Sequence, residues 1–310
     1  MAFIRGFGCS LPQRIVRNDE MAALAGCEPS WIADVSGIEQ RRYAEEGETV
    51  ASLAVGAAQD CLGKAGVEPA SVGLLMVASG SGERVFPGPA AIVSSRLGLG
   101  GVPAIDIAMA SAGGLFGMAL ASQLAPAYGC ILVIGAEKLS TIALRQPRDP
   151  SVAVLFGDGA GACLISAERG VAEIVDSGLY SDGAFAEDLT LEFDSPIKMN
   201  GRSVILQASR KLPRCIATVM ERNHLRASEV DAFLVHQANQ NLLVRVAQAL
   251  GVPPHRFYSN IRDYGNTSSA SMLIAAAEWS ATRGFCPGRP VMFAAFGAGL
   301  HWGALLATGV

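Results

Sequence analysis

Three polar residues are of types that could together carry acyl chemistry: Ser111, His236 and Asn266. Ser111 follows an apolar run at 104–107 and precedes Gly113 and an apolar stretch that predicts a helix. A helix N-terminus stabilises a developing negative charge, but a serine hydroxyl is too weak an acid to be ionised by that effect alone. As a nucleophile, Ser111 would therefore need a general base, and His236 is the only obvious one.

His236 and Asn266 also fit a second role, the stabilisation of a negatively charged oxygen. Each can donate a hydrogen bond while neutral, and two such donors aimed at one carbonyl oxygen would stabilise an enolate. Taken singly, a histidine at a strand end is more often structural, and an asparagine in Gly-Asn-Thr-Ser is a common turn residue. The chemical interpretation depends on the three residues together.

Four segments resemble active-site motifs of the β-ketoacyl-acyl-carrier-protein synthase III family, in the thiolase superfamily. They are Ala110-Ser111-Ala112-Gly113-Gly114, His236-Gln237-Ala238-Asn239, Gly265-Asn266-Thr267-Ser268 and Phe296-Gly297-Ala298-Gly299. The resemblance implies an acyltransferase that condenses an acyl thioester with a malonyl-carrier protein, with loss of CO₂, in fatty acid or polyketide biosynthesis. It implies no cofactor and no metal, because acyl-coenzyme A or acyl-carrier-protein thioesters are the substrates.

The resemblance also implies a role for each catalytic residue. Ser111 stands where the family normally has its acyl-accepting cysteine. His236 and Asn266 match the residues that bind the malonyl thioester carbonyl and stabilise the enolate. The backbone N–H groups of Ser111 and Ala298 would form the oxyanion hole for the acyl group, with Phe296 beside it.

Other matches imply a binding path for the thioester and a second subunit. Trp31 matches a tryptophan that stacks on the adenine of coenzyme A, and a half-buried surface anchor would explain it equally well. Phe86 matches a loop residue that reaches the acyl pocket of the partner, so the resemblance implies a homodimer. Four residues would line the pantetheine arm: Gly201, Ile205, Ala238 and Asn239.

Three positions depart from the family pattern. Val35, Pro150 and Asn241 stand where the family usually has arginines that bind coenzyme A or the carrier protein. Each lost arginine removes a charge-assisted hydrogen bond worth roughly 1.5–3 kcal/mol. We therefore expect weakened priming by coenzyme A unless another arginine compensates. The candidates are Arg145, Arg148 and Arg202.

The serine itself leaves three interpretations open. In the first, Ser111 forms a seryl ester, in a condensing enzyme or in an acyltransferase that does not condense. In the second, Ser111 is an engineered replacement of the cysteine in an ordinary synthase. In the third, the chain is a non-catalytic partner subunit of a condensing enzyme, although the retention of His236 and Asn266 argues against this.

The elements that must position these residues occur twice along the chain. Residues 71–78 resemble residues 229–236, and residues 130–135 resemble residues 290–295. Both pairs lie in an alternation of apolar strands and helices. This repeat predicts an α/β protein of two pseudo-repeated halves packed together.

We place the two halves at 1–170, with the candidate nucleophile, and 171–310, with the histidine and the asparagine. The family resemblance implies the thiolase-like five-layered αβαβα fold, with the site between the halves. The least repeated parts of the chain, 138–155 and 176–215, are where we expect a substrate-access region.

Composition limits location and partners. With 310 residues, 50% of them hydrophobic, the chain can bury a large core. It has no apolar run long enough to cross a membrane, so we expect no membrane contact. The seven cysteines show no CxxC pair and no metal-ligand spacing, and most lie in apolar runs, which favours buried free thiols in a reducing cytoplasm.

The net charge of −4 hides a local asymmetry. Residues 168–194 carry eight acidic residues and one arginine, whereas residues 198–226 carry seven basic residues and one glutamate. A basic surface favours an anionic partner such as a carrier protein, and a solvated helix face is the alternative. Nucleic acid fits poorly, because no aromatic residues alternate with the bases.

Overall fold

Apolar runs form the strands on which the first half is built. The computed structural model describes residues 1–310. Strand β4 (Val72–Ala78) pairs in parallel with β5 (Ala104–Ile107) and β6 (Cys130–Glu137). Strands β7 (Gly159–Ser166) and β1 (Phe3–Ser10) continue the sheet in antiparallel pairing. All residues of β7 are buried, as expected for a sheet covered on both faces.

The second half repeats this arrangement. Strand β11 (Ala232–Val235) pairs in parallel with β12 (Pro290–Gly297), and β13 (His301–Gly309) and β8 (Ala172–Ser181) follow in antiparallel pairing. Strands β4, β6 and β7 thus correspond to β11, β12 and β13. A short pairing of β1 with β8 joins both halves into a nine-stranded sheet in the order β11-β12-β13-β8-β1-β7-β6-β4-β5.

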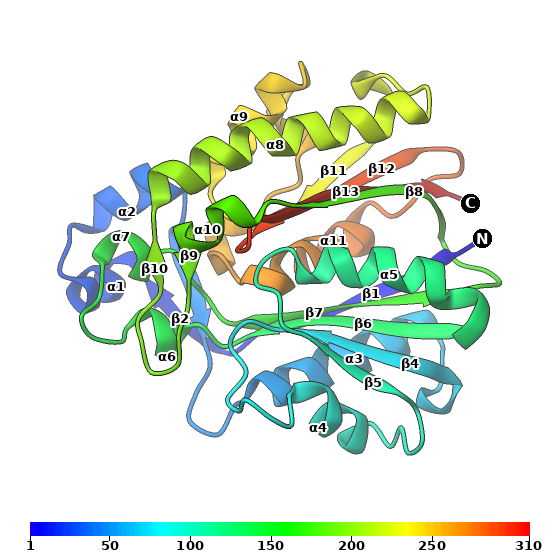
Figure 1. Cartoon of the computed structure of the whole chain (residues 1–310), viewed down its shortest axis with the longest axis horizontal. Helices are drawn as coiled ribbons and strands as arrows, with labels where there is room; N and C mark the ends of the chain where they lie inside the picture. The colour runs from blue at the N-terminus through cyan, green and yellow to red at the C-terminus, as the bar shows by residue number, and fades with distance from the viewer.

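Helices complete five layers (Figure 1). Helices α5 (Gly113–Tyr128) and α11 (Ser271–Thr282) lie between the halves, and each contacts strands of both. The outer layers are α3 (Val50–Ala65) with α4 (Pro89–Arg96) on one side, and α8 (Gly201–Arg222) with α9 (Gln240–Ala249) on the other. The predicted five-layered αβαβα fold with two pseudo-repeated halves is confirmed.

Local sequence signals explain where the outer helices begin and which face they bury. The Thr49 side chain accepts the N–H of Ser52, and the Ser52 hydroxyl accepts the N–H of Thr49, so a reciprocal capping box starts α3. Gly66, in the left-handed conformation at φ 60°, ends it. Small apolar residues on one face of α3, such as Ala54 and Ala57, are fully buried against the sheet.

The remaining elements are short. They are β2 (Arg14–Arg17), α1 (Asn18–Ala25), α2 (Pro29–Ser36), β3 (Gln40–Tyr43), α6 (Ser140–Ala143), α7 (Pro150–Ala153), β9 (Leu189–Thr190), β10 (Lys198–Met199), α10 (Ile261–Tyr264) and the 3₁₀ turns η1 (Pro69–Ser71), η2 (Gly183–Asp188), η3 (Ala227–Glu229), η4 (Pro254–Arg256) and η5 (Ser268–Ala270). No helix is both long and apolar enough to span a membrane. The seven cysteines are unpaired, as expected, but only Cys61, Cys163 and Cys215 are buried.

The predicted insertion at 176–215 was too long. Strand β8 continues to Ser181, and α8, the counterpart of α3, already begins at Gly201. Both belong to the repeat, so only residues 182–200, with η2, β9 and β10, are additional at this point.

Candidate functional site

Ser111 lies in a strained backbone conformation just before the central helix α5. Its φ is 63°, a left-handed value that is uncommon for a residue with a side chain and costs on the order of 1–3 kcal/mol. Its side chain is 9% exposed. The end of β12 packs directly on it, because a Cβ atom on Gly297 would lie 2.2 Å from the carbonyl oxygen of Ala110. Only glycine allows this approach, which brings the end of β12 against residues 110–112.

Ser268, on η5, is the side chain that contacts Ser111. The backbone N–H of Ser111 donates to Ser268 Oγ at 2.8 Å, and the two hydroxyl oxygens are 3.4 Å apart. Ser268 is also left-handed, with φ 46°, and is 3% exposed. The N–H that the family resemblance assigns to the acyl oxyanion hole is therefore already bonded. An acyl oxygen would have to share it or displace Ser268.

A buried carboxylate anchors η5 beneath the site. Glu137, the last residue of β6, is 0% exposed and accepts the N–H of Gly80, the hydroxyl of Ser81, and both the N–H and the hydroxyl of Ser269. A Cβ atom on Gly135 would lie 2.2 Å from the Ser269 carbonyl oxygen, so glycine is needed for this contact. Burial raises the pKa of Glu137, and the hydrogen bonds that it accepts oppose that rise.

His236 follows β11, and its Nδ1 lies 2.6 Å from the hydroxyl oxygen of Ser271, the first residue of α11. That hydroxyl oxygen also accepts the N–H of Gln237 at 3.1 Å and has no other partner. Its proton is satisfied only if the hydroxyl donates to Nδ1, since an unpaired buried donor is costly. The imidazole proton is then on Nε2. Burial lowers the pKa of His236 to about 4, so the ring is neutral near pH 7.

Asn266 is fixed in one orientation. Its Oδ1 accepts the N–H of Ser268 at 2.9 Å, while its backbone pairs with Leu155 and Gly157. Its Nδ2 makes no hydrogen bond within the protein. The Nε2–H of His236 and the Nδ2–H₂ of Asn266 are thus two neutral donors without a partner, which is the pair needed for an oxyanion.

The predicted catalytic residues do not all form hydrogen bonds with one another. No hydrogen bond connects Ser111 to His236, because Ser111 bonds to Ser268 and His236 to Ser271. The role of His236 as the base for Ser111 therefore stays a prediction. Nothing in the sequence distinguished Ser268, Ser271 and Glu137, although the serine-rich run at 268–271 marked the region.

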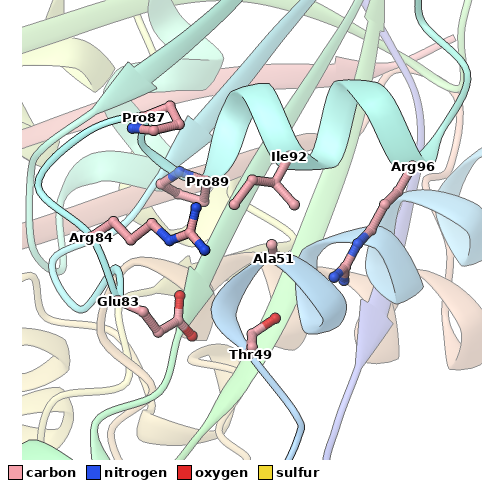
Figure 2. Close-up of a pocket in the computed structure, with 8 residues that line it drawn as sticks. All are labelled: Thr49, Ala51, Glu83, Arg84, Pro87, Pro89, Ile92 and Arg96. Carbon is pink, nitrogen blue, oxygen red and sulfur yellow. The ribbon is translucent and has the colours of Figure 1, made fainter.

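A cavity of about 910 Å³ opens beside Ser111, with Ala110 and Ala298 in its wall. Residues 79–85 form another wall, whereas Phe86 is not among the lining residues and is 84% exposed. A second cavity, of about 160 Å³, lies between the start of α3 and α4, where Arg84 and Arg96 stand on either side of it (Figure 2). Neither Ser111, His236 nor Asn266 is among the residues that line either cavity.

Val35 and Asn241, two of the three positions where the family usually has an arginine, contact each other. The side-chain amide of Asn241, on α9, donates to the carbonyl oxygen of Val35, on α2, at 3.3 Å. Asn239 donates to the same oxygen at 2.8 Å. Trp31, one turn earlier on α2, is half-buried. The third departure, Pro150, opens the short helix α7.

Family models and individual relatives agree on what this chain is similar to. The model described as 3-oxoacyl-[acyl-carrier-protein] synthase III matches residues 105–183, and the model of its C-terminal part matches residues 220–308. The β-ketoacyl-[acyl-carrier-protein] synthase III of Oleidesulfovibrio alaskensis is 34% identical, with 98% of each chain covered. A Streptomyces coelicolor synthase III is 36% identical over 98% of this chain and 96% of its own. The chain belongs to the 3-oxoacyl-[acyl-carrier-protein] synthase III family.

Solved structures of synthase III proteins have the same fold. The crystal structure of the synthase III from Aquifex aeolicus has a TM-score of 0.95 at 32% identity and covers 99% of this chain and 100% of its own. The priming β-ketosynthase of the R1128 polyketide pathway has a TM-score of 0.91 at 26% identity, covering 100% and 96%. This synthase III family member is therefore thiolase-like along its whole length.

The residues predicted to line the pantetheine arm fall at two neighbouring helix starts. Gly201 and Ile205 are on the first turns of α8, and Ile205 is 37% exposed. Ala238 and Asn239 immediately precede α9. Phe296, on β12, is buried against Trp302, with the ring centroids 6.5 Å apart. No three His, Cys, Asp or Glu side chains are grouped so as to hold a metal ion.

Proposed function

We propose that this synthase III family member condenses an acyl group, carried on Ser111, with a malonyl-carrier protein. Ser111 accepts the acyl group from a thioester and forms a seryl ester. The malonyl thioester then loses CO₂, and the resulting enolate carbon attacks the ester carbonyl. The products are a β-ketoacyl thioester and free Ser111, within fatty acid or polyketide synthesis.

The observation that carries this proposal is the pair of free neutral donors, His236 Nε2 and Asn266 Nδ2. Decarboxylation concentrates negative charge on the thioester carbonyl oxygen, and donors fixed in advance stabilise that charge without reorganisation. Ser271 fixes the proton on Nε2, and Ser268 fixes the amide of Asn266. A partner subunit without chemistry would have no use for this arrangement.

The contact between α2 and α9 supports a carrier protein as the acyl donor. The amides of Asn239 and Asn241 tie α9 to the carbonyl of Val35, a position where the family usually has an arginine that binds coenzyme A. No charged group replaces that arginine in this contact. We therefore infer slower priming by acyl-coenzyme A than by the same acyl group on a carrier protein, whose pantetheine arm lacks the adenosine phosphate.

The basic segment at 198–226 offers fewer unpaired positive charges to a partner than its seven basic residues indicate. Lys198, Lys211, Arg222 and Arg226 pair with Glu192, Asp182, Asp176 and Glu229. Three arginines on the exposed face of α8 remain without an acidic partner: Arg202, Arg210 and Arg214. We assign the docking of an acidic carrier protein to these three, through long-range attraction.

We also propose a homodimer in the cytoplasm. Strand β5 pairs only with β4, and its other edge is open, with Ile105 44% exposed. An open apolar edge favours pairing with a second strand, here the same strand of a second copy. Phe86, exposed on the neighbouring loop, would then reach the partner. The unpaired cysteines favour a reducing compartment.

Decarboxylation is the step that tests the proposal. CO₂ release from malonyl-carrier protein should occur in the parent protein and fall by about a hundredfold in Asn266→Ala, since loss of one oxyanion donor has that effect. Asn223→Ala, a substitution of the same kind just after the end of α8, should leave it unchanged. A parent that is acylated on Ser111 but releases no CO₂ would instead be an acyltransferase that does not condense.

A further inference from the structure

The backbone N–H of Ser111 is bound to another side chain of the same protein. It donates to Ser268 Oγ at 2.8 Å, which is within the range of a full hydrogen bond. In acyl-transfer sites the N–H of the nucleophile commonly binds the oxygen of the carbonyl under attack. In the unloaded protein, the Ser268 hydroxyl therefore occupies the place that a thioester carbonyl oxygen would need.

The backbone of Ser268 has little freedom to withdraw from this contact, because it is held on both sides. Its own N–H donates to Asn266 Oδ1 at 2.9 Å. The next residue, Ser269, donates its hydroxyl to the buried carboxylate of Glu137 at 2.8 Å and its N–H to the same carboxylate at 3.3 Å. With the backbone held, a turn of the Ser268 side chain about its Cα–Cβ bond is the motion that frees the N–H of Ser111.

The contact joins two strained residues. Ser111 and Ser268 have left-handed backbones, with φ of 63° and 46°, and each costs on the order of 1–3 kcal/mol. Both residues are also buried, so bulk water does not compete for the N–H. Strain of this kind persists where the surrounding structure enforces it, and it gathers at functional sites. Two such residues that meet in one hydrogen bond point to a use of that bond in the reaction.

We propose that Ser268 is a positioning residue whose hydroxyl closes the acyl oxyanion hole until its side chain turns away. This inference rests on the proposed acylation of Ser111. A thioester is attacked once its carbonyl oxygen has replaced the Ser268 hydroxyl at the N–H of Ser111. The N–H exchanges one hydrogen bond for another, so the closure slows acylation by the value of about one hydrogen bond and does not prevent it.

The same closure protects the seryl ester after loading. Hydrolysis would break the C–O bond of the ester, with the hydroxyl of water going to the acyl carbon and its proton to Ser111 Oγ. When the Ser268 hydroxyl has returned to the N–H of Ser111, the ester carbonyl lies outside the oxyanion hole. Water that attacks it then finds no N–H for the negative charge that develops on the carbonyl oxygen. The acyl group is kept until the malonyl thioester arrives, and condensation requires the side chain to turn away again.

Removal of the Ser268 hydroxyl tests the closure. Ser268→Ala and Ser268→Gly both keep the backbone N–H that binds Asn266, and glycine also adopts the left-handed backbone without strain. Each should raise the second-order rate constant for acylation of Ser111 by about fivefold, measured by intact-protein mass spectrometry with an acyl thioester and no malonyl donor. After the thioester is removed, each should lose its acyl group to water about fivefold faster than the parent.

Ser269→Ala is the matched control. It removes a hydroxyl one position away, one that binds Glu137 and not Ser111, and it should accelerate neither reaction. If Ser268 only held η5 in place, its substitution would lower the rate of acylation. A rise in both rates at position 268 alone is therefore a result that a structural role does not give.

The outcomes separate the closure from the proposed function. Slower or unchanged acylation in both Ser268 variants would overturn the closure, and the condensation would stand if the parent is acylated and releases CO₂. A parent that is acylated but releases no CO₂ would sink the condensation, while faster acylation of the variants would still support the closure. Acylation of the variants alone would mean a complete closure in a parent that does not load. No acylation of any of these proteins would overturn both proposals.

Discussion

The Nδ1 atom of His236 lies 2.6 Å from the hydroxyl oxygen of Ser271. The two residues are 35 positions apart in the second half, one just after β11 and the other at the start of α11. The contact places the imidazole proton on Nε2 and so makes the histidine a donor toward the substrate. Ser271 is therefore a positioning residue for the proposed decarboxylation.

Replacing Ser271 by alanine should slow CO₂ release from malonyl-carrier protein by about tenfold, which corresponds to the loss of about one hydrogen bond. The imidazole would then be free to place its proton on Nδ1 for part of the time. The measurement is the rate of CO₂ release at saturating substrate, where kcat should fall and KM should change little. Ser280→Ala, on the same helix, is the control, and an unchanged kcat in Ser271→Ala would contradict the assignment.

The low pKa of His236 predicts a pH dependence of stability. The folded-state pKa of about 4 lies below the ordinary value of 6.5, so the unfolded chain binds the extra proton first as the pH falls. The stabilisation is complete above pH 6.5 and is lost between pH 6.5 and pH 4. Between pH 7 and pH 5 the loss should be about 2 kcal/mol.

The contribution of His236 to the free energy of unfolding is measured by urea unfolding of the parent and of His236→Gln, each at pH 7 and pH 5. The parent should lose more free energy of unfolding than the variant. The same low pKa predicts that CO₂ release does not decline between pH 8 and pH 5 through protonation of His236. If the two proteins lose equal stability, the imidazole is not buried as a neutral ring.

Carrier docking on α8 should depend on salt and on particular arginines. Binding of a malonyl-carrier protein should weaken clearly when the salt is raised to several times the physiological level, since salt screens exposed charges. The double variant Arg210→Ala, Arg214→Ala should lose about fivefold in affinity at low salt. Arg222→Ala is the control because this arginine is paired with Asp176. Salt-independent binding would point to free coenzyme A thioesters as donors.

The open edge of β5 predicts the oligomeric state. The parent should be a dimer by light scattering coupled to size-exclusion chromatography, and Ile105→Lys should shift it to a monomer by placing a charge in the apolar interface. Val171→Lys changes an equally exposed apolar residue at a distance from β5, and it should remain dimeric. A monomeric parent would exclude the proposed reach of Phe86 into a second subunit.

The fold was predictable where strands are buried on both faces. Strands such as β4 and β12 form continuous apolar runs, so their repetition was visible in the sequence. Strand β8 has mostly half-exposed residues and α8 has a charged outer face, so neither resembles its counterpart in the first half. This explains why the predicted insertion ran too far, into α8.

The sequence proposed the motif residues of the candidate site but not the residues that hold them. Ser268 and Ser271 are ordinary serines in the sequence, and their roles depend on how closely η5 approaches β6 and α5, which Gly135 permits. The sequence also did not show how many of the basic residues at 198–226 pair with acidic residues. Lys211 is neutralised by Asp182, a residue from a distant part of the chain that only the fold brings near.

The central claim is that Ser111 carries the acyl group during condensation. The most direct measurement follows the mass of the intact protein and the β-ketoacyl product together, for the parent, Ser111→Cys and Ser111→Ala, with an acyl thioester and malonyl-carrier protein. The account predicts one added acyl group on the parent and on the cysteine variant, none on the alanine variant, and faster product formation by the cysteine variant because its thioester is the better electrophile. An acyl group that remains on the alanine variant, or a β-ketoacyl product formed at the parent rate without Ser111, would contradict it.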